Sequence, residues 1–341
     1  RGPQGTLYGR NSIGGAINLI TKTPGADPGA RVGIEAGSRS RLNADFYADT
    51  KLSDSTAVSF TGGFKSRGGL GDFRNLPNAG IKVGETQEVF ARVALRYDAD
   101  NVAVTIAADA NDAEGGLRPY TTLIDELPES SALRTAGYTN ADVSSDPYDN
   151  NTGQANQARV TNSASGVAVT LDWEISDMTR SKIIASARTS KYKAGLDDDS
   201  LIDDFLSFPE TGQADQQSLE FQVNGERGDW DFVSGIYYFE EEGDNFQSPT
   251  TFNGGTGGIF ILEQNVKSMA IFTNVGYAVN DDLRLSGGLR YTEDEKDVLA
   301  NVGIGPFDAS QDFDEISWEL AANYTLDGGM NVYGAIQNGY Q

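Results

Sequence analysis

The chain has 341 residues, with 50 acidic against 26 basic side chains and a net charge of -24. That charge argues against a nucleic-acid partner, because binding a phosphate backbone needs Lys and Arg. Cys and His are both absent, which excludes disulfides, thiolate metal sites and any catalytic triad that uses His as its base. No stretch approaches the roughly 18 consecutive apolar residues of a membrane-spanning helix.

Residues 1–29 differ from the rest of the chain, because Gly and Pro punctuate them and they carry a net positive charge. From Ala30 onward one pattern repeats: a run of alternating apolar and polar residues, a turn, and another run. We therefore predict two parts, 1–29 and 30–341. The sequence starts at Arg1 without a Met and stops inside an alternating run, so we expect further segments on both sides.

The alternating runs indicate β-strands with one apolar face. The clearest runs are 89–97, 167–175, 269–277, 283–291 and 316–324. About thirteen such runs can be counted, and each is long enough for a tilted strand of ~9–11 residues that crosses a membrane. An odd number of strands cannot close an antiparallel barrel, so we expect more strands in the intact wall.

The connections between these runs alternate between short and long. Short turns are predicted near 53–54, 99–100, 176–177, 224–225, 280–281 and 327–329, and long loops at 66–84, 112–161, 193–214, 243–264 and 297–311. Outer-membrane barrels have short turns on the periplasmic side and long loops outside. The pattern therefore predicts an all-β fold, a transmembrane antiparallel β-barrel.

Four aromatic residues on the apolar faces stand about three residues before a short turn: Tyr97, Trp173, Tyr277 and Tyr324. In a barrel they would form one ring at the periplasmic interface, where amphipathic rings are favoured. The alternative is that they are ordinary aromatics in the core of a soluble sandwich.

The first 24 residues, RGPQGTLYGRNSIGGAINLITKTP, resemble the end of the plug domain of TonB-dependent outer-membrane receptors. Residues 285–296, 317–324 and 332–340 resemble barrel hairpins of the same family. The glycines of the motif allow positive φ and close backbone approach, Pro3 fixes a bend, and 16–21 is predicted as a short strand. A phosphate-binding loop is disfavoured because no Gly-Lys-Ser/Thr follows.

The resemblance implies a barrel of roughly 22 strands with a plugged lumen, of which this chain holds about thirteen strands and the C-terminal end of the plug. It implies an outer-membrane protein of a Gram-negative bacterium, surrounded by lipid and lipopolysaccharide and energised by TonB with ExbB and ExbD. A ferric siderophore is the most frequent substrate of the family, while saccharides and cobalamin stay open. No cofactor and no enzymatic activity are expected. A passive porin and a secreted adhesin or carbohydrate-binding module are the alternatives.

Two groups of candidate site residues follow. The resemblance assigns plug structure and plug–barrel pairing to Arg1, Gly2, Pro3, Gly9, Gly14, Gly15 and Asn18, with Arg1 pairing to barrel glutamates. The alternative for Arg1 is that its side chain is merely solvated inside a water-filled lumen. Aromatic residues of the external loops are candidate ligand contacts: Tyr120, Tyr138, Tyr148, Phe205 and Phe208. Packing of the loops on themselves explains these aromatics equally well.

Two acidic groups and four arginines stand out among the charged side chains. The acidic groups at 197–204 and 109–114 could attract Ca²⁺, but their spacing does not match an EF-hand loop, and solvated acidic loops are the favoured interpretation. No metal site is predicted. Four arginines opposite the apolar faces, Arg92, Arg96, Arg284 and Arg290, are expected to face the lumen.

Overall fold

The computed structural model describes residues 5–9, 15, 17–76, 80–118, 126–143, 146, 150–153, 159–199, 201–247, 250–302, 305–326 and 328–339. The principal strands are β1 (Gly29–Gly37), β2 (Arg41–Lys51), β3 (Thr56–Arg67), β4 (Thr86–Ala99), β5 (Val102–Gly116), β6 (Arg159–Ser176), β7 (Thr179–Asp197), β8 (Leu206–Arg227), β9 (Trp230–Gln247), β12 (Phe260–Ala278), β13 (Leu283–Val302), β14 (Pro306–Leu326) and β15 (Met330–Gln337). The short elements are α1 (Gly5–Tyr8), α2 (Ala132–Thr135), the 3-10 helix Asn140–Asp142, β10 (Thr251–Phe252) and β11 (Gly255–Thr256). Among the described residues, no helix is long and apolar enough to cross a membrane.

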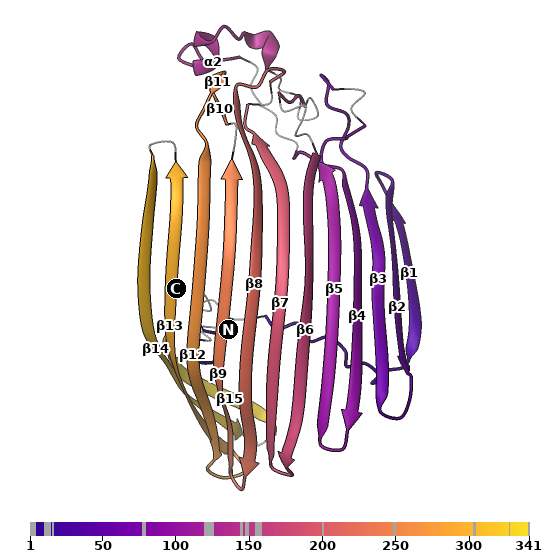
Figure 1. Cartoon of the computed structure of the whole chain (residues 1–341), viewed down its shortest axis with the longest axis vertical. Coiled ribbons are helices and arrows are strands. Elements are labelled where there is room, and N and C mark those ends of the chain that lie inside the picture. The colour runs from indigo at the N-terminus through magenta and orange to yellow at the C-terminus, as the bar shows by residue number, and fades with distance from the viewer. Residues whose placement is uncertain are drawn as a thin grey trace.

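The thirteen principal strands form one antiparallel sheet in chain order, from β1 to β15, while β10 and β11 attach to β8 (Figure 1). This confirms the predicted all-β fold and the number of strands. Neighbouring strands pair over long stretches, such as the nineteen residues of β12 against β13. Within the described part of the chain, β1 and β15 each pair with one neighbour, so the sheet has two free edges.

Tight turns lie at one end of the sheet and the long connections at the other, where α2, β10 and β11 stand above the strands (Figure 1). Two predicted connections were wrong, because residues 224–225 lie inside β8 and the stretch 297–311 is mostly strand. Residues 38–40, where no connection was predicted, make a tight turn at the loop end. The ladders continue beyond the apolar part of each strand, which is why hydrophobic alternation placed the loop boundaries too early.

One face of the sheet carries the apolar side chains. Near the turns, Trp230 packs against Tyr277 with ring centroids 4.4 Å apart, and Tyr97, Trp173 and Tyr324 are about half exposed on the same face. Toward the loop end, Tyr238 donates to Glu240 at 2.9 Å and Tyr291 to Glu293 at 2.7 Å. Apolar side chains fill the band between these two levels, which spans ~26 Å along β9, as expected for a lipid-facing barrel surface.

The other face is crossed by the segment that precedes β1 (Figure 1). Helix α1 lies against β12, β13 and β14, Arg92 on β4 donates to Thr21 at 3.5 Å, and Gly25 N donates to Asp49 Oδ1 on β2 at 2.7 Å. We call this the inner face. The strand alternation places Arg92, Arg96, Arg284 and Arg290 on it, as predicted.

The short strand predicted at 16–21 is not formed in its described residues, 17–21. The side chains of Ile17, Leu19 and Ile20 are almost fully exposed. A strand needs a neighbour to share its backbone hydrogen bonds, and no strand pairs with these residues in the described part of the chain.

Candidate ligand-binding mouth and N-terminal contact

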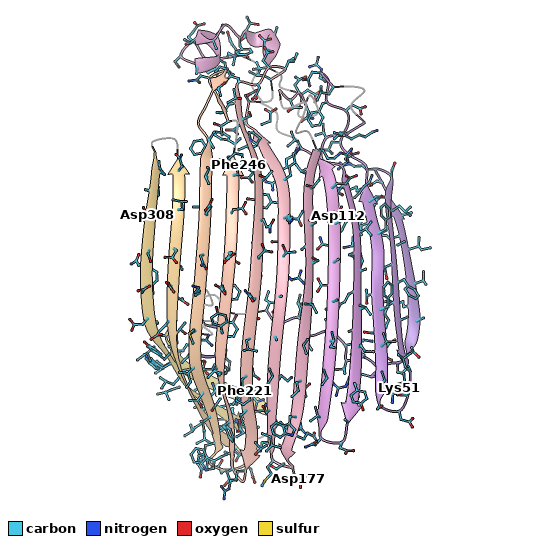
Figure 2. All side chains as sticks on the ribbon, in the orientation of Figure 1. Lys51, Asp112, Asp177, Phe221, Phe246 and Asp308 are labelled. Atoms are coloured by element: carbon cyan, nitrogen blue, oxygen red, sulfur yellow. The ribbon has the colours of Figure 1, made fainter. Side chains whose placement is uncertain are left out.

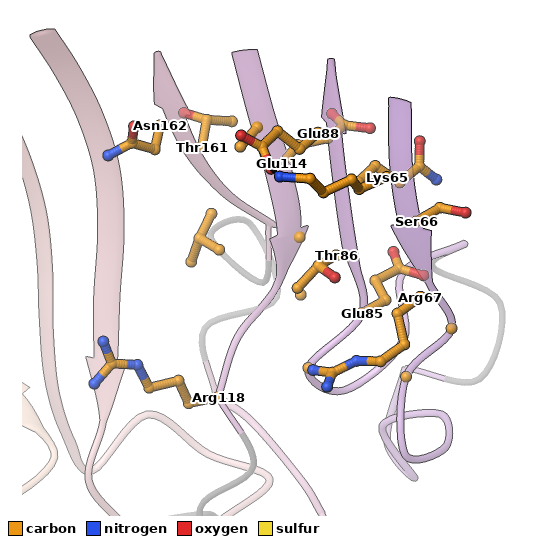
Figure 3. A pocket seen from close by; sticks show the side chains of 18 of the residues that line it. Lys65, Ser66, Arg67, Glu85, Thr86, Glu88, Glu114, Arg118, Thr161 and Asn162 are labelled. Carbon is orange, nitrogen blue, oxygen red and sulfur yellow. Dashed lines mark hydrogen bonds and ion pairs between the residues drawn. The ribbon is translucent and has the colours of Figure 1, made fainter. Parts of the chain in front are cut away.

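A cavity of about 1000 Å³ opens on the inner face at the loop end of strands β2 to β8. We call it the mouth pocket, and Figure 3 shows Lys65, Arg67, Glu88 and Arg118 around it. Its volume lies at the upper end of the range for small-molecule sites. A cavity with this position can receive a ligand that arrives from the loop side.

More basic than acidic residues line the mouth pocket. The basic ones are Arg39, Arg41, Lys65, Arg67, Arg118 and Lys193, and the acidic ones are Glu85, Glu88, Glu114 and Glu210. Six against four leaves a surplus of two positive charges, although the whole chain carries -24. Lys65 pairs with Glu88 at 3.2 Å, whereas exposed Arg67 and Arg118 have no ion pair within the described ranges. These two guanidinium groups are available to a ligand.

Close backbone packing forms one wall of the mouth pocket. The loop after β3 folds down onto the end of β5, where a Cβ at Gly116 would collide with the carbonyl oxygen of Lys82. Beside this contact, Phe73, Val83 and Leu117 form a small buried apolar cluster. The cluster holds the loop against the strand, so Arg118 leaves the strand end at a fixed place.

Hydrogen bonds of side chains tie the external loops to one another. Asn75 Nδ2 donates to Thr152 O at 2.7 Å and Thr152 N donates to Asn75 Oδ1 at 3.1 Å. Thr152 Oγ1 also donates to the buried carboxylate of Asp197. Thr251 donates to Asp204 at 2.8 Å. The loops after β3, β5, β7 and β9 thus form one connected loop layer above the sheet.

The acidic residues at 197–204 serve this loop layer. Gly153 N donates to Asp197 at 3.1 Å, while Leu201 N and Leu206 N donate to the two oxygens of Asp199 at 2.7 and 2.5 Å. Burial raises the pKa of the Asp199 carboxyl from 3.8 to about 6, against the opposing effect of these backbone donors. Asp197 and Asp199 are buried and act as acceptors for loop backbone, so the prediction of a solvated acidic loop is wrong for these two carboxylates.

The candidate aromatic residues lie in different environments. Tyr138 packs edge-on against Phe205, with ring centroids 5.5 Å apart and planes at 84°, and Phe205 is buried. Phe208 lies in β8 opposite Leu196, not in a loop. Tyr120 and Tyr148 lie outside the described residues. The structure brings Tyr138 and Phe205 together as packing within the loop layer, and their contact with a ligand stays a prediction.

The N-terminal contact involves the glycine motif. Gly9 has φ of +74° and Gly15 of +122°, the positive values that the motif predicted. Gly9 and Thr6 are buried against the inner face, and the guanidinium of Arg290 lies where a Cβ at Gly9 would be 3.2 Å from Nη2. Asn18 is exposed, and Arg1, Gly2, Pro3 and Gly14 lie outside the described residues. The pairing of Arg1 stays a prediction.

Sequence reasoning missed the basic lining of the mouth pocket. A signal was present, because Arg39 and Arg41, like Lys65 and Arg67, are two residues apart at strand ends, and residues spaced by two lie on one face of a strand. Nothing in the sequence shows that separate strand ends converge on one cavity, since that depends on the curvature of the sheet.

Comparisons with known proteins agree with this architecture. The family described as TonB dependent receptor-like, β-barrel, matches residues 196–341. The pesticin receptor of Yersinia enterocolitica is 24% identical over the whole chain and 48% of its own length. The vitamin B12 transporter BtuB of Vibrio vulnificus is 31% identical over 99 residues, which are 29% of this chain and 16% of that protein. The chain thus spans about half the length of the curated relatives that match all of it.

Solved structures show the same fold. The ferric yersiniabactin uptake receptor FyuA from Yersinia pestis superposes with a TM-score of 0.78 at 18% identity, covering 98% of this chain and 50% of that one. The siderophore receptor PiuA from Acinetobacter baumannii gives a TM-score of 0.75 at 13% identity, covering 98% and 52%. The antiparallel wall therefore has the fold of these receptors, and residues 196–341 match the β-barrel of the TonB-dependent receptor family.

Proposed function

We propose that this chain supplies one part of the wall and the end of the plug of an outer-membrane importer that takes up a ferric siderophore with energy from TonB. Residues 1–29 are the plug end and 30–341 the barrel wall. The protein acts in the outer membrane of a Gram-negative bacterium, with lipid and lipopolysaccharide around it and with TonB, ExbB and ExbD as partners. Transport consists of binding and gated release, without a covalent step.

The charge of the mouth pocket is the observation that supports an anionic substrate. A surplus of two positive charges inside a chain of -24 concentrates an anionic ligand at the mouth, because a concave site focuses the field of its lining. Ferric chelates of catecholate or carboxylate type are anionic, whereas saccharides are neutral. The pesticin receptors and siderophore receptors among the similar proteins point in the same direction.

The inner face favours a plugged importer over a passive porin. A porin needs an open lumen, but here the segment before β1 crosses the inner face and buries Thr6 and Gly9 against it. Uptake of cobalamin is the second candidate, and the match to the vitamin B12 transporter supports it.

Ligand titration of the full-length protein in detergent tests the proposal. The panel contains a ferric catecholate, a ferric hydroxamate, cyanocobalamin and a maltooligosaccharide. Arg67→Ala and Arg118→Ala should each weaken binding of the anionic ferric chelate about fivefold, the equivalent of ~1 kcal/mol for one lost charge contact. Lys182→Ala is the control, because Lys182 lies on the inner face near the turns and pairs with Asp172 at 3.2 Å.

A ferric chelate that binds tightly, loses affinity in both arginine variants and keeps it in the lysine variant supports siderophore uptake. Tight binding of cyanocobalamin or the oligosaccharide alone would assign the other substrate classes. Induction of the full-length gene by iron starvation is an independent check, and its absence would move the search away from iron.

A further inference from the structure

Arg290 occupies an unusual place on the inner face. Its side chain is 4% exposed, its Nε donates to Thr292 Oγ1 at 3.0 Å, and its guanidinium carbon lies 5.7 Å from the ring of Tyr237 and 5.6 Å from that of Phe272. Two aromatic faces and one hydroxyl therefore hold the planar cation, an arrangement that suits arginine better than lysine.

The N-terminal segment covers this cation. Gly9 packs on the guanidinium, where a Cβ would lie 3.2 Å from Nη2 and 3.3 Å from Cζ. Its φ of +74° also favours glycine. A second close contact lies two residues before Arg290 on β13, since a Cβ at Gly288 would lie 3.2 Å from the side chain of Thr6. Gly9 on the segment and Gly288 on the wall have no side chains, so the segment contacts the wall directly.

A third contact lies beside the other two. A Cβ at Gly5 would lie 3.0 Å from Ser317 Oγ, and Ser317, which is fully buried, stands opposite Arg290 in the register of β13 and β14. The segment from Gly5 to Gly9 thus packs against Arg290 and two adjacent wall residues, Gly288 and Ser317.

We propose that Arg290, held between Tyr237 and Phe272, is the wall anchor that keeps the Gly5–Gly9 segment in the closed position. The cation–π contacts are strong while the segment keeps water away from them. When the segment leaves, water reaches the guanidinium and weakens the same contacts. The anchor therefore favours the closed state and has to be broken during opening. This inference rests on the proposed function, in which residues 1–29 are the end of a plug.

The chain offers a matched control on the same strand. Arg284 lies six residues before Arg290 on the same face and pairs with Asp231 on β9, not with any described residue of the N-terminal segment. Arg290→Lys keeps the charge but loses the planar fork that stacks on two rings. Arg284→Lys makes the same chemical change away from the segment. A difference between the two variants then reports the anchor and not the loss of an arginine.

The test measures leakage through the full-length protein in planar bilayers without TonB, with heat-modifiable migration as the check of folding. Arg290→Lys, Arg290→Ala and Gly9→Ala should each raise the open fraction of channels by about tenfold. Arg284→Lys should stay at the level of the wild type. Closed channels in both folded Arg290 variants would overturn the proposal, and so would equal leakage from Arg284→Lys.

A disulfide separates failure of this inference from failure of the proposed function. Thr6→Cys with Gly288→Cys places two Cβ atoms 3.2 Å apart, just below the usual ~3.5–4.5 Å of a disulfide, and the chain has no other Cys. If residues 1–29 are a plug that moves, the oxidised pair should block uptake in cells, and reductant should restore it. If uptake continues with the disulfide oxidised, residues 1–29 are not a moving plug. If the disulfide blocks uptake but the Arg290 variants do not leak, only the anchor is refuted.

Discussion

Arg188 on β7 reaches Asp109 on β5 across the intervening strand, with 2.6 Å between Nη2 and Oδ2. Gly166 on β6 stands between them in the register of the sheet, and a Cβ there would lie 3.2 Å from the guanidinium carbon. A similar arrangement recurs at Arg284, which pairs with Asp231 over Gly276, although Gly276 stands opposite Ser286 in the register. On the inner face, glycine thus lets an arginine join strands that are not neighbours.

Replacing Gly166 by Val should therefore break the ion pair and destabilise the wall. The valine side chain takes the space through which Arg188 passes, and the partly exposed pair contributes about 1 kcal/mol before any clash is counted. The measurement is the denaturant midpoint of the full-length protein in detergent, followed by the loss of heat-modifiable migration.

Gly243→Val is the matched control for this prediction. Gly243 also lies inside a strand on the inner face, but a Cβ there would meet nothing nearer than 3.7 Å. Valine has a higher β-strand propensity than glycine, so this variant should be as stable as the wild type or more stable. Equal midpoints for the two valine variants would show that the passage over Gly166 is not needed.

The sequence predicts the lumen-facing arginines Arg92, Arg96, Arg284 and Arg290, because alternation along a single strand assigns the face of each residue. It does not predict their partners. The pairing of Arg188 with Asp109 depends on the register of three strands, and sequence separation of 79 residues carries no sign of it. Side-chain direction is a local property of a strand, whereas pairing is a property of the assembled sheet.

The carboxyl of Asp199 should make the loop layer sensitive to pH. Its folded pKa of about 6 lies above the ordinary 3.8, so the folded loop binds a proton more tightly than the unfolded loop. Its contribution to stability is present below about pH 4 and is lost as pH rises through about 6. Hydrogen exchange of the Leu201 and Leu206 amides, corrected for intrinsic rates, should be about tenfold slower at pH 5 than at pH 7.5.

Asp199→Asn serves as the control, because the amide keeps the shape of the side chain but does not titrate in this range. Its corrected exchange rates should be the same at both pH values. Wild-type protection that is equal at pH 5 and pH 7.5, or greater at pH 7.5, would contradict the assignment of a raised pKa to this carboxyl.

Asn75→Ala should release the loop after β3 from the loop layer. The amide makes two hydrogen bonds with the backbone of Thr152, and Thr152 is 1% exposed. Leaving its buried groups without these bonds costs ~1–3 kcal/mol locally. Limited proteolysis should then cut residues 68–85 at least several times faster, while the wall stays folded.

Asn101→Ala tests whether this effect is specific to the loop layer. Asn101 donates to Glu174 O at 3.3 Å at the opposite, turn end of the sheet, so its loss should leave cleavage of residues 68–85 unchanged. If both variants are cut at the same rate, the bonds of Asn75 do not hold the loop.

The loop end of the sheet also shows why strand boundaries were harder to predict than strands. On β13, Glu293, Glu295 and Asp297 continue the outer face above Tyr291, opposite Asp314, Asp312 and Ser310 on β14. The backbone ladder is unbroken there, but the outer side chains are no longer apolar, as expected for the part of a barrel wall that extends beyond the lipid. Hydrophobic alternation therefore ends several residues before the strand does, and residues 297–311 resembled a loop.

Trp318 provides a direct test of which face meets the lipid. It lies on the apolar face of β14, opposite Leu289, between Asp314 on the loop side and Tyr324 on the turn side. The distances along the strand are ~13 Å to Asp314 and ~20 Å to Tyr324, so the indole lies within the apolar band. Trp173 and Trp230 stand near the turns instead.

Single-tryptophan variants of the full-length protein, reconstituted in lipids brominated at different depths, measure these positions. Trp318 should be quenched most strongly by bromine near the middle of the acyl chain. Trp173 and Trp230 should be quenched most by bromine close to the headgroups, since aromatic rings near the turns lie at the interface. Because all three side chains are on one face, quenching that spares Trp318 while aqueous iodide reaches it would place that face toward water, and the assignment of the wall's two faces would be reversed.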